Sequence, residues 1–202
     1  MSDHPPAASP RSAGVERRTA ETDIRLTLTL DGSGRADVTT GLGFLDHMLT
    51  ALARHGRFDL ELVCEGDLEV DDHHTVEDCA LALGQAIDGA LGDRRGIRRF
   101  AHAFAPLDEA LARVVLDLSG RPCAVVELGF AHSRLGDLAT ENLTHFFQSL
   151  ATTARMALHV DLLRGANDHH RAEAAFKALA LALRQAVAHD GHGDIPSTKG
   201  TL

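Results

Sequence analysis

Hydrophobic and polar positions along the chain follow two periods, one typical of strands and one of helices. Residues 23–30 are apolar at every second position, which predicts a strand with one buried face. After the Gly-rich turn at 31–34, residues 35–39 are expected to return as its hairpin partner. A helical apolar stripe follows over 44–56, an alternating strand over 58–63, and a long apolar helix from 73 to about 91.

The second half of the chain repeats this order. Strands are predicted over residues 98–105, 111–118, 123–128 and 156–163, and helices over 141–155 and 169–188. A repeat of about 90 residues indicates a duplicated half-domain, which we place at 15–96 and 97–190. Residues 1–14, rich in Pro, Ala and Ser, are expected to be a disordered leader, and 191–202 form a C-terminal tail.

Each half then contains one sheet and two helices, and each element has one apolar face. A sheet that is apolar on one side must be covered on that side. We therefore predict an α+β fold with an internal duplication, in which two mixed β-sheets lie outside and four helices pack between them.

The two long helices begin with nearly the same sequence, HHTVE at 73–77 and HHRAE at 169–173. The first His and the Glu of each copy are four positions apart, so they share one helix face and can reach one cation. The second His is rotated by about 100° and needs another partner. Asp72 and Asp168 are the expected N-caps. A single helical His is more often packed or capping than a ligand, but two copies of this pattern favour metal binding.

Each half also carries one histidine on its shorter helix, His47 and His145. Six histidines and two glutamates give three imidazoles and one carboxylate to each of two metals. Such a set leaves positions open on a six-coordinate ion, as catalytic sites do. Imidazole with carboxylate suits Mn, Fe, Co, Ni or Zn, and the two ions could hold a flat ligand between them.

Composition narrows the class of protein. The 202 residues carry a formal net charge of −9 and contain no Trp or Tyr, which argues against a nucleic-acid partner. The sequence has neither an apolar run of about 18 residues nor an apolar signal core, so we expect no membrane association and a cytoplasmic location. Cys64, Cys79 and Cys123 are expected to be buried small hydrophobes in a reducing compartment.

Seven short motifs together resemble the imidazoleglycerol-phosphate dehydratase family, over about residues 17–200. They are RTAET at 18–22, FLDHML at 44–49, HHTVED at 73–78, SGRP at 119–122, NDHH at 167–170, FKAL at 176–179 and PSTKG at 196–200. Gln148 and Leu107 depart from the family pattern, which usually has Glu and Met there. Neither position coincides with a proposed ligand.

The resemblance implies a fold like domain 2 of ribosomal protein S5 and two manganese ions per active site. It implies that one Mn²⁺ takes His47, His74, His169 and Glu173. It implies that the other takes His73, Glu77, His145 and His170. It also implies a homo-oligomer of 24 subunits, built from trimers, with active sites between subunits.

The implied reaction is a step of histidine biosynthesis, the dehydration of D-erythro-imidazole glycerol phosphate to imidazole acetol phosphate. Glu21 is the implied acid–base and substrate-binding group; without the resemblance it reads as a solvated strand-edge charge. The implied contacts to this phosphorylated imidazole substrate are Arg99, Arg121, Lys177, Ser197 and Lys199. The tail at 191–202 would then cover the substrate rather than fray.

Two other functions fit the residues alone. A di-metal phosphate-ester hydrolase would hold two bridged metals about 3.5–4 Å apart. In a non-enzymatic protein, the metals would only join subunits.

Overall fold

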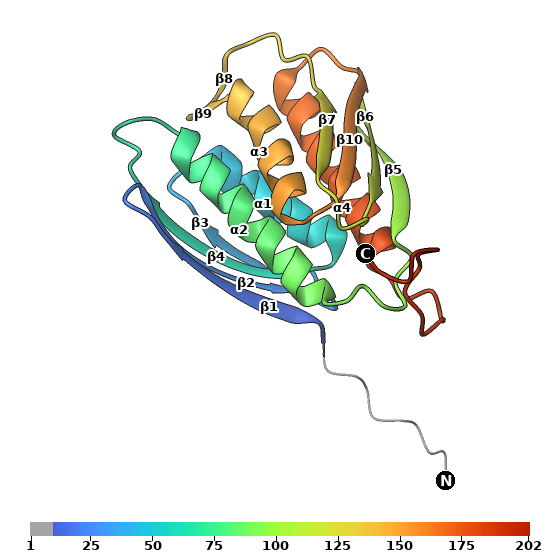
Figure 1. Ribbon diagram of the computed structural model, residues 1–202. Coiled ribbons are helices and arrows are strands. Elements are labelled where there is room, and N and C mark those ends of the chain that lie inside the picture. Colours follow the sequence, from blue (N-terminus) through green and yellow to red (C-terminus); the bar gives the residue numbers. More distant parts are fainter. Residues whose placement is uncertain (1–9) are drawn as a thin grey trace.

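The structure of the chain, a computed structural model, describes residues 10–202. Four helices lie between two four-stranded sheets, so the predicted α+β arrangement is confirmed (Figure 1). Of the leader expected at 1–14, residues 1–9 lie outside the described residues. The rest of that expectation is wrong, because a strand begins at Ser12.

The first sheet has the order β1-β2-β4-β3, formed by β1 (Ser12–Arg18), β2 (Thr22–Thr29), β4 (Asp59–Gly66) and β3 (Ala36–Thr39). The predicted hairpin between residues 23–30 and 35–39 is wrong. β2 forms its hairpin with β1, and β3 pairs in parallel with β4 instead. A parallel pair needs a crossover connection, and a helix supplies it here.

The second sheet has the matching order β5-β6-β10-β7, formed by β5 (Phe100–Leu107), β6 (Ala110–Asp117), β10 (Ala157–Arg164) and β7 (Cys123–Glu127). The pairings also match, because β10 is antiparallel to β6 and parallel to β7. This agreement shows the duplication. A short pair, β8 (Arg134–Leu135) with β9 (Leu138–Ala139), was not predicted.

The helices are α1 (Gly43–Gly56), α2 (His73–Leu91), α3 (Thr140–Thr153) and α4 (Asp168–Ala186). α2 packs against α3 and α1 packs against α4, so each pair joins the two halves. Phe146, Phe147 and Phe176 form a mutual ring cluster in the shared core, with centroids 4.9–5.9 Å apart. The two halves therefore share one hydrophobic core.

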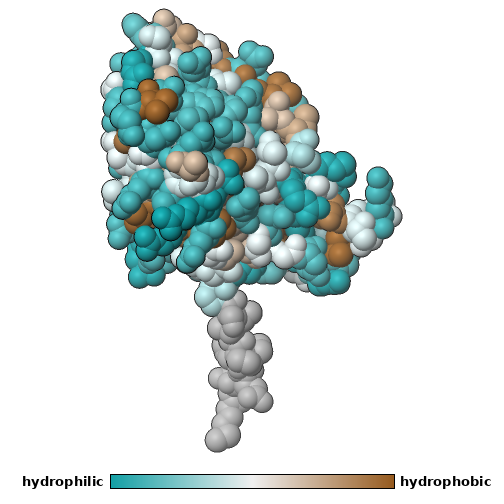
Figure 2. Space-filling model, turned by 60° about the vertical axis from the view of Figure 1, so that its left-hand side comes forward, coloured by the Kyte–Doolittle hydropathy of each residue, from teal (hydrophilic) through white to brown (hydrophobic). Residues whose placement is uncertain are grey.

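The expected burial of the three cysteines is only partly confirmed. Cys64 and Cys79 are buried as expected, but Cys123 is exposed because the first residue of β7 faces outward. Figure 2 shows a largely hydrophilic face with scattered hydrophobic residues. Within residues 10–202, no helix is both long enough and apolar enough to cross a membrane.

α2 lies very close to the end of α3 at Gly84. A Cβ atom at this position would lie 2.6 Å from the Leu150 carbonyl oxygen and 2.8 Å from the Ala154 nitrogen. Both neighbours are backbone atoms, so they could move only by separating the two helices.

We predict that Gly84→Ala lowers the free energy of unfolding by about 1–3 kcal/mol, as overpacking does, although Ala has the higher helix propensity. Thermal and urea denaturation measure the change. Gly193→Ala is the control, because a Cβ there meets no atom within 4 Å. A Gly84→Ala protein that is as stable as the parent would contradict the close packing.

Candidate metal-binding site

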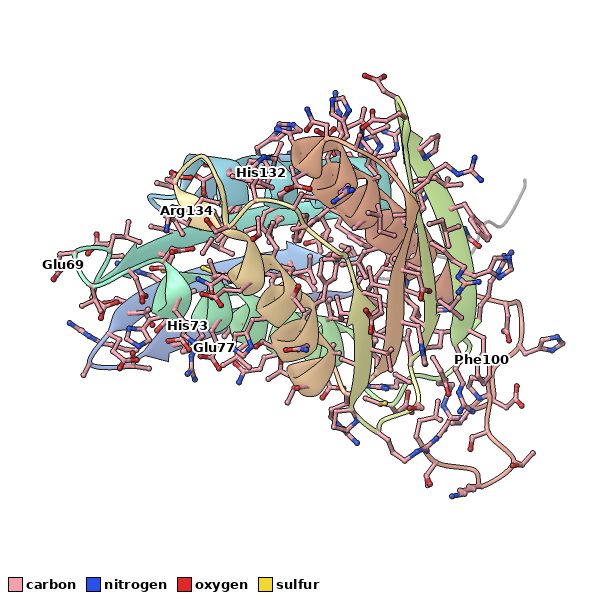
Figure 3. All side chains as sticks on the ribbon, turned by 90° about the horizontal axis from the view of Figure 1, so that it is seen from above. Glu69, His73, Glu77, Phe100, His132 and Arg134 are labelled. Carbon is pink, nitrogen blue, oxygen red and sulfur yellow. The ribbon has the colours of Figure 1, made fainter. Side chains whose placement is uncertain are left out.

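One cluster of ligand-type side chains lies where α2 passes α3. The Glu77 carboxylate is 3.4 Å from His73 Nε2 through one oxygen and 3.4 Å from His145 Nε2 through the other. The two imidazole rings stack, with centroids 4.9 Å apart. His73 and Glu77 lie side by side in Figure 3. The helix period supplies the pair on α2, and packing against α3 supplies the third group.

A second cluster lies where α1 passes α4. Glu173 Oε2 is 3.2 Å from His169 Nε2 on the same helix and 3.2 Å from His47 Nε2 on α1. In both clusters the three ligand atoms lie within 4.8 Å of one another. Imidazole nitrogens and a carboxylate oxygen at this spacing fit the donors of a divalent transition-metal ion.

The remaining two predicted ligands, His74 and His170, belong to neither cluster. His74 Nδ1 is 3.0 Å from Asp67, and its Nε2 is 3.5 Å from Glu21. His170 Nδ1 is 2.7 Å from Glu109. The nearby carboxylate raises the pKa of each imidazole, Asp67 for His74 and Glu109 for His170. Within one chain, six of the eight predicted ligands therefore converge and two point elsewhere.

Glu173, the carboxylate of the second cluster, has a lowered pKa. Burial alone would raise its pKa, but the Lys177 ammonium 2.7 Å away and the His47 imidazole outweigh burial and hold the pKa at about 2. The side chain is therefore a carboxylate at neutral pH and is available as a ligand. Lys177, predicted from the resemblance to bind substrate, is paired with Glu173 in this structure.

Glu21 lies in the exposed turn between β1 and β2. The Thr19 hydroxyl accepts hydrogen bonds from the backbone N–H groups of Glu21 and Thr22. Thr22 in turn donates its hydroxyl to the buried Asp78 carboxylate on α2. These contacts hold the Glu21 backbone beside α2, and its side chain remains half exposed.

The other predicted substrate contacts lie at the far end of α4. Arg99 pairs with Asp117 at 2.7 Å, donates to the Pro196 carbonyl at 2.7 Å, and bonds through its backbone N–H to the Ala186 carbonyl. The ligand histidines lie at the other end of α4. Ala186 follows His170 by 16 residues, which is about 24 Å along the helix axis. Figure 3 shows Phe100, next to Arg99, on the far side of the molecule from His73 and Glu77.

Three further predicted contacts lie at or near this far end. Ser197 and Lys199 are in the C-terminal segment, and the Ser197 hydroxyl accepts from the Lys199 backbone N–H. Arg121 is exposed after β6, beside Gly120, whose added Cβ would meet the Leu202 carbonyl carbon at 2.5 Å. One chain thus does not bring these cations together with its own ligand clusters.

Comparison with known proteins decides the family. The sequence matches the family model for imidazoleglycerol-phosphate dehydratase over residues 40–183. A relative of that name from Methanothermobacter thermautotrophicus is 60% identical, covering 92% of this chain and 95% of its own. Another, from Phytophthora nicotianae, is 59% identical over 95% of this chain but only 42% of its own, longer, chain. The chain belongs to the imidazoleglycerol-phosphate dehydratase family.

A solved structure agrees with this assignment. The chain superimposes on an imidazoleglycerol-phosphate dehydratase from Pyrococcus furiosus with a TM-score of 0.81 and 36% identity, covering 93% of this chain and 100% of that one. The protein is thus an enzyme of the hydro-lyase class, which removes water from its substrate.

In both ligand helices, the aspartate expected to cap the first turn makes no cap hydrogen bond. The expected N-cap Asp168 is wrong by one position: Asn167 caps α4 by accepting from the N–H groups of His169 and His170. Asp72 occupies the cap position of α2 but makes no cap hydrogen bond, and the Asp71 carboxylate accepts from the His73 N–H instead.

The Asp72 and Asp168 carboxylates bind the segment 131–142 instead. Asp168 accepts from the N–H groups of Ala131 and His132, and Asp72 accepts from the Ala139 N–H and the Asn142 amide. Both carboxylates are almost fully buried. The segment that carries β8 and β9 is thereby tied to the first turn of both ligand helices.

The sequence did not reveal Asp67, Glu109 and Asn142, although each contacts a predicted ligand histidine. For Asp67 and Glu109 the only signal was indirect, and for Asn142 there was none. Each second histidine was expected to need a partner other than the shared cation, but spacing could not identify that partner.

We predict that Lys177→Met raises the pKa of Glu173 above its present value of about 2, because it removes an ammonium group 2.7 Å away. ¹³C NMR titration of the glutamate carboxylates in metal-free protein measures the shift. Lys199→Met, which removes an exposed lysine from the C-terminal segment, should leave that pKa unchanged. An unchanged Glu173 pKa in Lys177→Met would show that burial and the histidines set it alone.

Proposed function

We propose that this chain dehydrates D-erythro-imidazole glycerol phosphate to imidazole acetol phosphate in histidine biosynthesis, acting in the cytoplasm with two Mn²⁺ ions. The observation that carries the proposal is the pair of His-His-Glu clusters, each drawn from both halves of a chain that belongs to this dehydratase family. Two separate cation sites suit a flat azole ring, which has one nitrogen donor on each side.

The fourth ligand of each metal would come from another subunit. His74 and His170 each have a carboxylate partner on Nδ1, an arrangement that fixes the proton there and leaves the Nε2 lone pair for a metal. Neither reaches a cluster of its own chain. In the proposed assembly, His74 completes the His47, His169 and Glu173 set, and His170 completes the His73, Glu77 and His145 set.

The phosphate-binding groups would be shared between subunits for the same reason. Arg99 and the C-terminal segment lie at the C-terminal end of α4, whereas the ligand residues lie near its N-terminal end. If they act on the same substrate, they must act in the site of a neighbouring subunit. Arg99, Arg121, Ser197 and Lys199 would then bind the phosphate, with the tail covering it. This sharing supports a closed homo-oligomer, which we propose to be a 24-mer of trimers.

The chain's own residues would supply positioning and proton transfer. The clusters orient the ring, and bound cations would favour its deprotonated form. Glu21, half exposed beside His74, would exchange protons with the substrate side chain as hydroxide leaves and the adjacent C–H is lost. The Thr19 hydroxyl accepts from the Glu21 backbone N–H and so holds the backbone that carries this carboxylate.

We predict that chelation of bound metal abolishes dehydration and that added Mn²⁺ restores it. The assay follows imidazole acetol phosphate formation in full-length protein before and after metal removal. Inorganic phosphate is measured in the same samples, because release of phosphate would indicate the hydrolase instead. Full activity without metal would defeat the di-manganese proposal, and smaller oligomers without lost activity would indicate a purely structural metal.

We also predict that two inactive variants restore activity when mixed, if the site is shared between subunits. In metal-free His47→Ala and His74→Ala proteins that are combined before Mn²⁺ is added, some sites receive an intact cluster from one chain and His74 from the other. Dehydration should recover to about a quarter of the wild-type rate, the share expected from random mixing.

The matched control mixes His47→Ala with Glu173→Gln. Both residues belong to one cluster of a single chain, so no mixed oligomer contains that cluster intact. This mixture should remain inactive. Equal recovery in the two mixtures, or recovery in neither, would contradict the proposed sharing of ligands between subunits.

A further inference from the structure

The two ligand clusters use the same residue types but have different neighbours. The helix pairs α2/α4 and α1/α3 are equivalent under the duplication, with the ligand pairs His73/His169 and His47/His145 at matching positions. By the same offsets, Asn142 on α3 corresponds to Phe44 on α1, and Lys177 on α4 corresponds to Leu81 on α2. At both positions the two halves carry different residue types, and each position lies next to a proposed metal ligand.

Asn142 fixes the orientation of His73. Its amide Nδ2 donates to Asp72 Oδ2 at 3.0 Å, and its Oδ1 accepts from His73 Nδ1 at 3.0 Å. A carboxylate oxygen can only accept here, so the amide cannot be reversed. The His73 proton is therefore on Nδ1, and the Nε2 lone pair faces Glu77. Both Asn142 and Asp72 are 4% exposed, so water competes little for these bonds.

His169, the counterpart of His73, has no such partner. Within residues 10–202, its Nδ1 makes no hydrogen bond, and the neighbouring group is the Phe44 ring in an edge-to-face arrangement 5.2 Å away. The contact restricts the ring by packing but does not select a tautomer. Partners that orient a ligand histidine typically contribute about 10–100-fold to metal affinity.

The carboxylates differ as well. Lys177 Nζ lies 2.7 Å from Glu173 Oε1 and brings a positive charge to the second cluster. Leu81, at the equivalent position beside Glu77, brings none. A cation that enters the second cluster must share the Glu173 carboxylate with the Lys177 ammonium, and the positive charge of Lys177 repels the cation.

The proposed fourth ligands do not cancel this difference. His74 and His170 are each held through Nδ1 by a carboxylate, Asp67 at 3.0 Å and Glu109 at 2.7 Å. They are therefore alike in kind, and the inequality arises from the three-residue clusters.

We propose that the two clusters are unequal cation sites, in which His73, Glu77 and His145 bind a divalent cation more tightly than His47, His169 and Glu173. Asn142 is a positioning residue that strengthens the first cluster, and Lys177 weakens the second. This inference rests on the metal-binding role proposed above. Its consequence is ordered loading: at limiting metal the first cluster fills while the second, needed for the other ring nitrogen, is largely empty.

Titration of metal-stripped full-length protein with Mn²⁺ alone tests the inequality, by calorimetry and by electron paramagnetic resonance of the free ion. The wild type should show two classes of equal number whose Kd values differ by about tenfold or more. His47→Ala and His145→Ala, at equivalent positions, assign the classes: the first should retain the tight class and the second the weak one. Equal Kd values, or the reverse assignment, would overturn the inference.

The neighbours are tested one at a time. Asn142→Ala should weaken the tight class by about tenfold or more and leave the weak class unchanged, whereas a general loss of structure would weaken both. Lys177→Met should tighten only the weak class, by about threefold to tenfold. Phe44→Ala, the counterpart of Asn142→Ala, should leave the tight class unchanged.

The outcomes separate this inference from the proposed function. If the wild type binds two Mn²⁺ with distinct affinities but Asn142→Ala and Lys177→Met leave both Kd values unchanged, the assigned cause is wrong. If the wild type binds no Mn²⁺, the di-manganese proposal fails instead.

Discussion

The packing of a long helix from one half against a short helix from the other determines both the core and the ligand clusters. The helix period alone can place His73 beside Glu77, but only the approach of α3 to α2 brings His145 to the same carboxylate. That approach depends on the missing side chain at Gly84, where backbone atoms of Leu150 in α3 and of Ala154 just after it lie within 3 Å of an added Cβ. A change that separates the helices would therefore disturb the ligands as well as the core.

Much of this architecture could be predicted because it depends on periodicity and repetition. Alternation located most of the strands, the repeat gave the two sheets, and the four-residue spacing gave both His–Glu pairs. The β2–β3 hairpin was wrong because the turn at 31–34 shows where the chain reverses but not which strand becomes the neighbour. β1 was missed because its residues alternate only between exposed and half-buried, a weak signal beside a Pro- and Ala-rich stretch.

The partners of the ligand histidines could not be predicted, because they are distant in sequence. Asn142 is 69 positions from His73, and Glu109 is 61 positions from His170. Such contacts are set by the whole fold. The N-cap error has a related cause: Asp168 has the right residue type for a cap, but its carboxylate is bound to the N–H groups of Ala131 and His132, so the cap passes to Asn167.

A duplicated half produces two nearly equivalent sites, whereas the proposed substrate carries its reacting side chain on only one side of the ring. The two halves must therefore differ somewhere near the substrate. One such difference lies in the turns that join β1 to β2 and β5 to β6. In the β1–β2 turn, the Glu21 side chain is half exposed and remains open to a ligand. In the corresponding β5–β6 turn, Glu109 accepts from the N–H groups of Ala166 and Asn167 and from His170, and these bonds hold its pKa at about 2. Glu109 thus braces the start of α4, whereas within residues 10–202 the Glu21 carboxylate accepts no backbone N–H group and does not brace a helix in this way.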